Sequence, residues 1–209
     1  GIGAGALGLS TTGSYNTSVG QGSMYANTTG AYNTALGNNA LDANTTASYN
    51  TAVGMDALGA NTTGQGNVAL GRNALVLNTT AANNTAVGMS AMAANTTGGL
   101  NVAIGYAALD ANVTGAANTA VGYNAASATT TDGVTAIGKD ALELNTTGIN
   151  IAIGSNALAA VTTGSTNVAV GNDSLNVNTA GNNTALGYYT LKVNTTGGSN
   201  TALGDRALR

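Results

Sequence analysis

The side chains that could carry acid–base chemistry in this chain are eight carboxylates, and they are scattered along its 209 residues. Only Asp140 and Glu143 lie close in sequence, beside Lys139 and on either side of a predicted core strand. A glycosidase needs two carboxyl groups about 5 to 10 Å apart, but this pair is better interpreted as a solvated patch. Because the chain has no His and no Cys, a Ser-His-Asp triad, a Cys-His pair and the common zinc sites are excluded. The residue types therefore predict a protein that is not an enzyme and has no cofactor and no metal site.

Tyrosines are the side chains best suited to binding. Tyr15, Tyr32 and Tyr49 occupy the same position in three successive copies of a repeat, so they are predicted to stack as an exposed ladder. Tyr106 and Tyr123 form a second pair. A tyrosine ring combines a flat apolar surface with a hydroxyl group, which suits contacts with sugars or proteins. The alternative is that the rings only pack on each other and cover the edge of a turn. The candidate glycan-binding or receptor-binding residues are Tyr15, Tyr25, Tyr32, Tyr49, Tyr106 and Tyr123.

Threonine and asparagine recur in a turn motif, as in Asn27 to Gly30, and each suggests an alternative function. Regular outward rows of Thr could order water as an ice-binding surface, but adjacent side chains on a strand face opposite ways, so only one row would point outward. Many of the Asn residues lie in Asn-x-Thr sequons, whose glycosylation would coat the molecule with sugar. The other interpretation of these Asn residues is structural, because Asn caps turns by bonding to nearby backbone and could form ladders along the axis.

All of these residues are positioned by a repeat of 16 or 17 residues. A motif such as Asn33 to Gly37 returns along the chain, and the glycine that closes it recurs thirteen times, from Gly3 to Gly204. A period this short fits one coil of a β-solenoid, in which each coil buries its apolar side chains by stacking on the next. The sequence therefore predicts an all-β fold, a parallel β-solenoid of about twelve coils, in which residues 1–209 form a single repeat array.

Three apolar columns form the predicted core. The residue before each anchoring glycine is aliphatic in every copy, as in Leu36, and the fourth residue after the glycine is apolar in every copy, as in Leu41. The second residue beyond that position, as in Ala43, is the third column. Loops absorb deletions better than stacked strands, so the residue missing from each of three 16-residue coils is placed near the second turn, as at 148–150.

Alanine fills the position two before the anchoring glycine in eleven of thirteen copies, directly beside the aliphatic residue assigned to the core. Neighbouring residues on a strand face opposite sides, so this alanine is predicted to point outward. A strand that is apolar on both faces is usually buried on both, which indicates contact with another copy of the chain. The alternatives are that local bends put both residues inside, or that an exposed alanine is simply tolerated. The predicted self-association residues are Ala35, Ala52, Ala69, Ala86, Ala103 and Ala120.

The composition disfavours several partners. A formal net charge of -3 with only five basic residues leaves no electrostatic footprint for nucleic acid, whose binding depends on Lys and Arg. No apolar run approaches the length of about 18 residues that a spanning helix needs. Because the chain opens and closes inside a repeat, we expect it to be a fragment of a longer fibre protein.

Strings such as 101–105 and 167–171, each followed by two variable residues and then Ala or Ser, resemble the head repeats of trimeric autotransporter adhesins. Related arrays occur in phage tail-fibre and similar surface-fibre proteins. The resemblance covers essentially the whole chain, although the Asn-Thr-Thr-Gly half of each coil departs from the adhesin pattern. It implies a left-handed parallel β-roll, a homotrimer with its chains side by side, and a role in attachment at a cell surface, at a virion surface or elsewhere outside the cell.

The expected function is therefore that of a non-enzymatic structural fibre or adhesin segment. It would be a stiff shaft or head about 58 Å long that attaches to a host or to a surface receptor such as a glycan. The main alternative is an extracellular filament subunit that stacks end to end, and a further alternative is an ice-binding solenoid. The expected partners are other copies of the chain and a cell-surface receptor, with neither nucleic acid binding nor membrane insertion in this segment.

Overall fold

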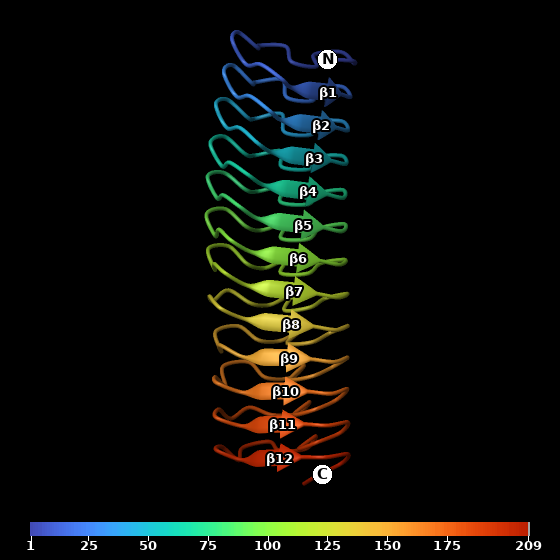
Figure 1. Cartoon of the computed structure of the whole chain (residues 1–209), viewed down its shortest axis with the longest axis vertical. Coiled ribbons are helices and arrows are strands. Elements are labelled where there is room, and N and C mark those ends of the chain that lie inside the picture. The colour runs from blue at the N-terminus through green and yellow to red at the C-terminus, as the bar shows by residue number, and fades with distance from the viewer. Residues whose placement is uncertain (209) are drawn as a thin grey trace.

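The chain forms a rod in which each coil stacks on the one before it (Figure 1). A computed structural model describes residues 1–208, and all twelve strands in this range lie in one parallel sheet, in the order of the sequence. Each strand has three residues. The predicted all-β, parallel β-solenoid is confirmed. The strands are β1 (Thr17–Val19), β2 (Thr34–Leu36), β3 (Thr51–Val53), β4 (Val68–Leu70), β5 (Thr85–Val87), β6 (Val102–Ile104), β7 (Thr119–Val121), β8 (Thr135–Ile137), β9 (Ile151–Ile153), β10 (Val168–Val170), β11 (Thr184–Leu186) and β12 (Thr201–Leu203).

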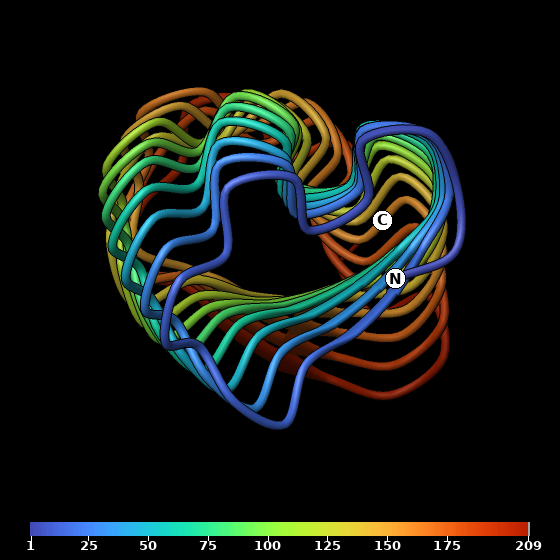
Figure 2. The same cartoon turned by 90° about the horizontal axis from the view of Figure 1, so that it is seen from above.

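The register of the sheet matches the repeat of the sequence, so equivalent residues of successive coils are physical neighbours. Ala35 lies beside Ala52, and Leu36 lies beside Val53. Viewed along the axis, the coils superpose with a small rotation from each to the next (Figure 2). The predicted reading of the sequence as stacked columns is therefore correct.

The anchoring glycines recur because no other residue fits at this position. Gly37 has a φ of 142°, in a region that residues with a Cβ rarely adopt. A Cβ on Gly37 would also meet the carbonyl group of Gly54 in the next coil, and the same clash repeats from coil to coil. The glycine column thus lets successive coils approach closely enough to pair.

The two residues that precede this glycine point in the directions opposite to those predicted, the alanine inward and the aliphatic residue outward. Ala35 is fully buried, whereas the Leu36 side chain is 48% exposed. The physical reason is the narrow interior of a coil, where a leucine such as Leu41 already fills much of the space and the facing strand can contribute only a methyl group. The larger aliphatic side chain is therefore turned outward. The alanines predicted to mediate self-association are all fully buried in the core of their own chain and cannot contact another copy: Ala35, Ala52, Ala69, Ala86, Ala103 and Ala120.

Of the two remaining predicted core columns, the one that contains Leu41 is correct and the one that contains Ala43 is wrong. Leu41 and its equivalents from Met24 to Leu191 are buried, but Leu77 and Val193, which lie two residues beyond that column, are more than half exposed. The prediction assumed a strand, whereas Leu41 has a φ of 57° and the segment around it is a turn, so side chains do not alternate there. The residue before the leucine, such as Ala40, is buried instead.

Two ladders of buried asparagines line the inside of the rod. In the first, which we call the turn ladder, Asn61 Nδ2 donates to the Oδ1 of the equivalent Asn44 at 3.2 Å and to the Gly64 carbonyl at 3.0 Å. Its Oδ1 accepts from Asn78 at 2.8 Å. The structural interpretation of the repeated asparagines is thereby confirmed. The turn ladder runs unbroken through Asn27, Asn44, Asn61, Asn78, Asn95 and Asn112.

The second ladder, the strand ladder, precedes each strand. Asn50 Oδ1 accepts the backbone N–H of Asn67 at 2.9 Å, and Asn50 Nδ2 donates to the Gly64 carbonyl at 2.9 Å. Both asparagines are almost fully buried. Since a buried amide must be satisfied, these bonds fix each coil against the next. The strand ladder includes Asn33, Asn50, Asn67, Asn84, Asn101 and Asn118.

The shortened coils lose their residue at two different places. In a full coil, Asn33 Nδ2 bonds to the carbonyl of Ala47, 14 residues on. The equivalent bond from Asn118 reaches Thr131, only 13 residues on, and the coil at 171–187 behaves in the same way. These two coils are therefore shortened inside the Asn-Thr-Thr-Gly turn, where the prediction was wrong. In the third, the residue is lost after Gly148, as predicted, because the bond within the turn from Asn145 is retained.

Candidate association and recognition surfaces

One outward surface runs the full length of the sheet and is formed by the first and third residues of every strand. We call it the strand face. Its third-position side chains are aliphatic throughout, and no residue in any of the twelve strands is charged. It therefore combines a regular row of aliphatic groups with a row of Thr, Val and Ile. Its most exposed aliphatic members within β1 to β12 include Leu36, Leu70, Ile104, Ile137, Leu186 and Leu203.

The predicted N-terminal tyrosine ladder is present. The ring centroids of Tyr15 and Tyr32 lie 4.9 Å apart, and those of Tyr32 and Tyr49 lie 5.2 Å apart, and in both pairs the ring planes are nearly parallel. All three side chains are more than half exposed. Stacking covers both faces of the Tyr32 ring, so this ladder offers mainly ring edges and hydroxyl groups. The column continues with Gly66, which leaves the far side of Tyr49 without a neighbouring ring.

The other candidate tyrosines are arranged in two ways. Tyr106 and Tyr123 stack, with centroids 5.1 Å apart, as their shared position predicts. Tyr25 is separate from the N-terminal ladder and lies over Gly8, where an added Cβ would come within 2.7 Å of the Tyr25 ring. The structure thus brings the six candidate tyrosines together as one triple stack, one pair and one single ring rather than as one site.

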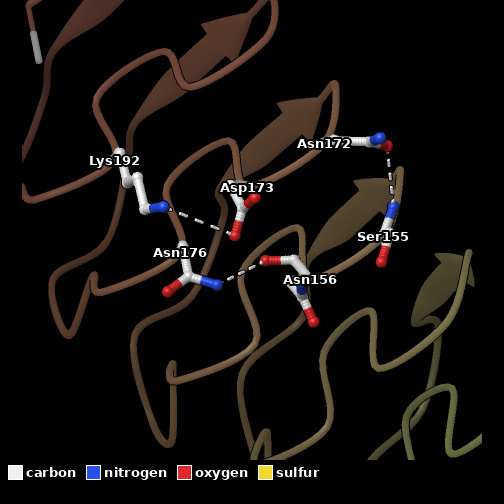
Figure 3. A network of polar contacts seen from close by, with 6 residues as sticks. All are labelled: Ser155, Asn156, Asn172, Asp173, Asn176 and Lys192. Carbon is white, nitrogen blue, oxygen red and sulfur yellow. Dashed lines mark hydrogen bonds and ion pairs between the residues drawn. The ribbon is translucent and has the colours of Figure 1, made fainter.

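A further group of side chains, which we call the C-terminal polar cluster, consists of Asp173, Asn176, Tyr188, Tyr189, Lys192 and Arg206. Lys192 Nζ lies 3.8 Å from Asp173 Oδ1 and also 3.8 Å from the centroid of the Tyr189 ring. Figure 3 shows Asp173 and Lys192 reaching toward each other from successive coils. The rings of Tyr188 and Tyr189 meet edge to face, with centroids 4.1 Å apart.

Sequence reasoning missed this cluster, although a signal for it was present. Asp173, Tyr189 and Arg206 each lie two residues after an anchoring glycine, in three successive coils. The stacking of columns alone therefore predicts that an acid, an aromatic ring and a base are neighbours here. The hydrogen bond to Tyr189, followed by partial burial, raises the pKa of the Tyr188 hydroxyl above its ordinary value.

The carboxylates do not assemble into a site. Lys139 Nζ lies 3.1 Å from Asp140 Oδ2, and no strand separates Asp140 from Glu143, contrary to the prediction. Burial raises the pKa of Asp42 and that of Asp110 above the usual value of 3.8. Among residues 1–208, no three His, Cys, Asp or Glu side chains are grouped in a way that could hold a metal ion.

The threonine pairs lie outside the strands. Thr28 Oγ1 is half-buried and donates to the Thr45 carbonyl at 3.0 Å, whereas Thr29 is exposed. Only one row of each pair therefore faces solvent, as predicted, but it follows a bend rather than a flat strand. The row that these pairs expose therefore does not lie on a strand.

The sequon asparagines are mostly inaccessible. Asn27, Asn44 and Asn61 are fully buried members of the turn ladder. Attachment of a sugar to these side chains would require the rungs of the ladder to separate. The folded rod is thus closed to glycosylation at these positions.

A shallow pocket of about 290 Å³ opens where the coil at 138–154 lacks its residue. Ile149 and Ile151 line it with exposed apolar side chains. It adjoins the strand face, because its lining also includes the first residues of β9 and β10. The pocket is a local widening of that apolar surface.

Comparisons with family models, with curated proteins and with solved structures find no match to this chain. Within the described residues, no helix is long and apolar enough to cross a lipid bilayer. The candidate surfaces must therefore be interpreted from their own geometry.

Proposed function

We propose that this chain is a non-enzymatic structural segment of an extracellular fibre or adhesin, exposed at a cell or virion surface. It acts as a stiff shaft that assembles side by side as a homotrimer. Continuous pairing of β1 to β12 and two asparagine ladders support the stiffness, because bending the rod would strain hydrogen bonds in every coil. Attachment to a host receptor is the function that such a shaft would serve.

The observation that carries the proposal is the strand face. One of its two rows is aliphatic in every strand, the other is mostly Thr, and the whole face is uncharged and continuous along the rod. Exposed apolar patches larger than a few hundred Å² are rare on monomeric proteins and usually mark an interface. A parallel sheet is normally covered on both sides, whereas here its inner side packs on the core and its outer side is bare. The surface that self-associates is thus the sheet that the sequence indicated, with the aliphatic side chains in the role predicted for the alanines.

The oligomeric state tests this proposal. The mass of the protein in solution, measured by light scattering over a range of concentrations, should be three times that of the chain. Replacing Leu36 and Leu70 by Lys should dissociate it, because charges on the strand face would be buried without partners. The same replacement at Leu77 and Leu144, which are exposed to a similar degree but lie off the sheet, should leave the mass unchanged.

Two results would contradict the trimer. A wild-type protein that stays monomeric at every concentration would remove the strand face as an interface. A mass that keeps growing with concentration would indicate the filament that stacks end to end.

The N-terminal tyrosine ladder is the proposed receptor contact of the shaft. Its hydroxyl groups form a regular exposed row on rings that hold each other rigidly. Changing Tyr15, Tyr32 and Tyr49 together to Ser should abolish binding to host cells. A matched triple change to Phe, which keeps the stack and removes only the hydroxyls, should weaken binding to a smaller extent. Unchanged binding by the Ser variant would dismiss the ladder as a receptor site.

A further inference from the structure

The C-terminal polar cluster differs from every other surface of the rod in holding two bases, an acid and two aromatic rings together. Lys192 and Arg206 are two of only five basic residues in the chain. Lys192 is held between the Asp173 carboxylate and the Tyr189 ring, each 3.8 Å from its ammonium group. A long side chain fixed by two partners has already lost its rotamer freedom, so it can donate a hydrogen bond to a ligand at little entropic cost.

The cluster also exposes unused hydrogen-bonding atoms. Asn176 Nδ2 donates to the Asn156 carbonyl at 2.9 Å, which orients the amide, while its Oδ1 accepts no bond within residues 1–208. Figure 3 shows this oxygen turned away from Asn156, beside the coil that carries Lys192. Asp173 uses Oδ1 toward Lys192 and keeps Oδ2 available. Fixed acceptors thus lie next to a fixed donor.

The ring of Tyr188 is the more exposed of the two aromatic rings in the cluster. A stacked pair such as Tyr106 and Tyr123 covers one face of each ring, whereas an edge-to-face pair covers the face of only one ring. Tyr188 meets Tyr189 edge to face, and it is 45% exposed. The Arg206 guanidinium lies 5.9 Å from the Tyr188 centroid and forms no ion pair with any described residue.

The charges of this region indicate the class of ligand. Lys192 and Arg206 are balanced by Asp173 and by Asp205, which precedes Arg206 in the sequence. The four charges sum to zero, so a strongly anionic or cationic ligand would gain little net attraction. A neutral polyol can use both kinds of group, because each hydroxyl both donates and accepts.

We propose that the C-terminal polar cluster binds a neutral saccharide, with the Tyr188 ring packed against the apolar face of one sugar. Hydroxyl groups of that sugar donate to Asp173 Oδ2 and Asn176 Oδ1 and accept from Lys192. The Arg206 guanidinium lies on the side of the Tyr188 ring that faces away from the sugar. This site is separate from the tyrosine ladder and does not depend on self-association through the strand face, so it can stand or fall independently of the shaft function.

Native gel electrophoresis through neutral polysaccharides tests the site. The full chain should be retarded in gels that contain dextran, mannan or galactan, and alginate serves as the acidic comparison. Tyr188→Ser should weaken the retardation about tenfold, whereas Tyr188→Phe should keep most of it because the ring remains. Asp173→Asn should also weaken it, since the charged acceptor and its hold on Lys192 are lost.

Tyr123→Ser is the matched control. Tyr123 lies in the same column as Tyr188 and is exposed to a similar extent, 49%, but its ring is stacked on Tyr106. This variant should migrate like the wild type in every gel, and circular dichroism of all variants should show an unchanged fold. The proposal is overturned if no neutral polysaccharide retards the protein, if only alginate does, or if the Tyr188 and Tyr123 variants lose retardation equally.

Discussion

The coils up to Gly122 and the two shortened coils between Gly122 and Gly154 share one backbone frame, formed by the sheet and the anchoring glycines, but differ in the side chains buried inside the rod. Strands β7, β8 and β9 continue the sheet without a gap, and the anchoring glycines keep φ values between 130° and 141° across this region. Inside the rod, however, Thr129 replaces an asparagine of the turn ladder and Val134 replaces one of the strand ladder. The frame is therefore common to both regions, whereas the ladders are not.

The consequence appears at the junction of the two regions. Asn112 Oδ1 is the one buried side-chain polar atom within residues 1–208 that has no hydrogen-bond partner. In the earlier coils, the next asparagine would donate to it. Thr129 Oγ1 instead donates to the Asn145 carbonyl at 3.1 Å. The glycine column and the sheet therefore define the solenoid, while the ladders add stability that can be interrupted locally.

The largest expected effect concerns the common frame. Gly71→Ala and Gly138→Ala should each lower the free energy of unfolding by about 3 kcal/mol or more, because each adds positive-φ strain and a clash with the glycine of the next coil. Urea unfolding followed by circular dichroism would measure it. Gly59→Ala is the control, since Gly59 does not have a positive φ and the nearest atom to its added Cβ is 3.3 Å away. Clearly unequal costs at Gly71 and Gly138 would show that the two regions do not share a frame.

A second test separates the regions. Asn61→Ala removes three side-chain hydrogen bonds and should cost about 3 kcal/mol, because buried partners are left unsatisfied. Thr129→Ala removes only two and should cost about half as much. The midpoints of urea unfolding would give both values. If the two variants were equally destabilised, the interrupted ladder would be as strong as the regular one.

A third change should repair the interruption. Thr129→Asn places an amide beside Asn112 Oδ1 and should raise the free energy of unfolding by about 1 kcal/mol. Thr130→Asn, one residue further on, should not stabilise the fold, because it only exchanges the exposed hydrogen bond from Thr130 Oγ1 to the Thr146 carbonyl. A loss of stability from Thr129→Asn would mean that the shortened turn has no room for the longer side chain.

The smallest effect concerns charge in the regular coils. Burial raises the pKa of Asp42 and of Asp110 in the folded state, so the folded chain holds these protons more tightly than the unfolded chain. Stability contributed in this way is present at low pH and is lost as the pH rises through the folded pKa. Asp42→Asn and Asp110→Asn should therefore each raise the free energy of unfolding at pH 7, by only a few tenths of a kcal/mol because the groups are partly solvated. Near pH 2.5 the gain should vanish. The Asp140→Asn variant, in a shortened coil where Lys139 pairs with the carboxylate, should show no such gain at pH 7.

The sequence predicted which residues stack in columns, but not which of the columns point into the core and which point to solvent. The period of the glycines was enough to place every strand and the tyrosine stack, because a stacked coil repeats its neighbour. The side on which Leu36 and Ala35 lie was predicted wrongly, because the larger aliphatic residue was assigned to the core. Thr34, a polar residue on the same face of the strand as Leu36, indicated the opposite. Leu41 was correctly predicted to be buried. Its positive φ, however, ends the strand-like alternation of side chains that the prediction assumed, so Ala40 is buried in place of Ala43. The contact between Lys192, Asp173 and Tyr189 depends on side-chain reach across coils, which the pattern of columns suggests and only coordinates establish.

Because each coil pairs with the next in the same register, equivalent positions are evenly spaced along the rod. Each coil carries the same position one strand spacing further along the axis, about 4.8 Å per step, and the chain has no cysteine of its own. Cysteines introduced at exposed sites of one column, such as Leu77 and Leu144, would hold two probes a known number of steps apart. A label, a ligand or a second protein could thus be displayed at intervals chosen by counting coils.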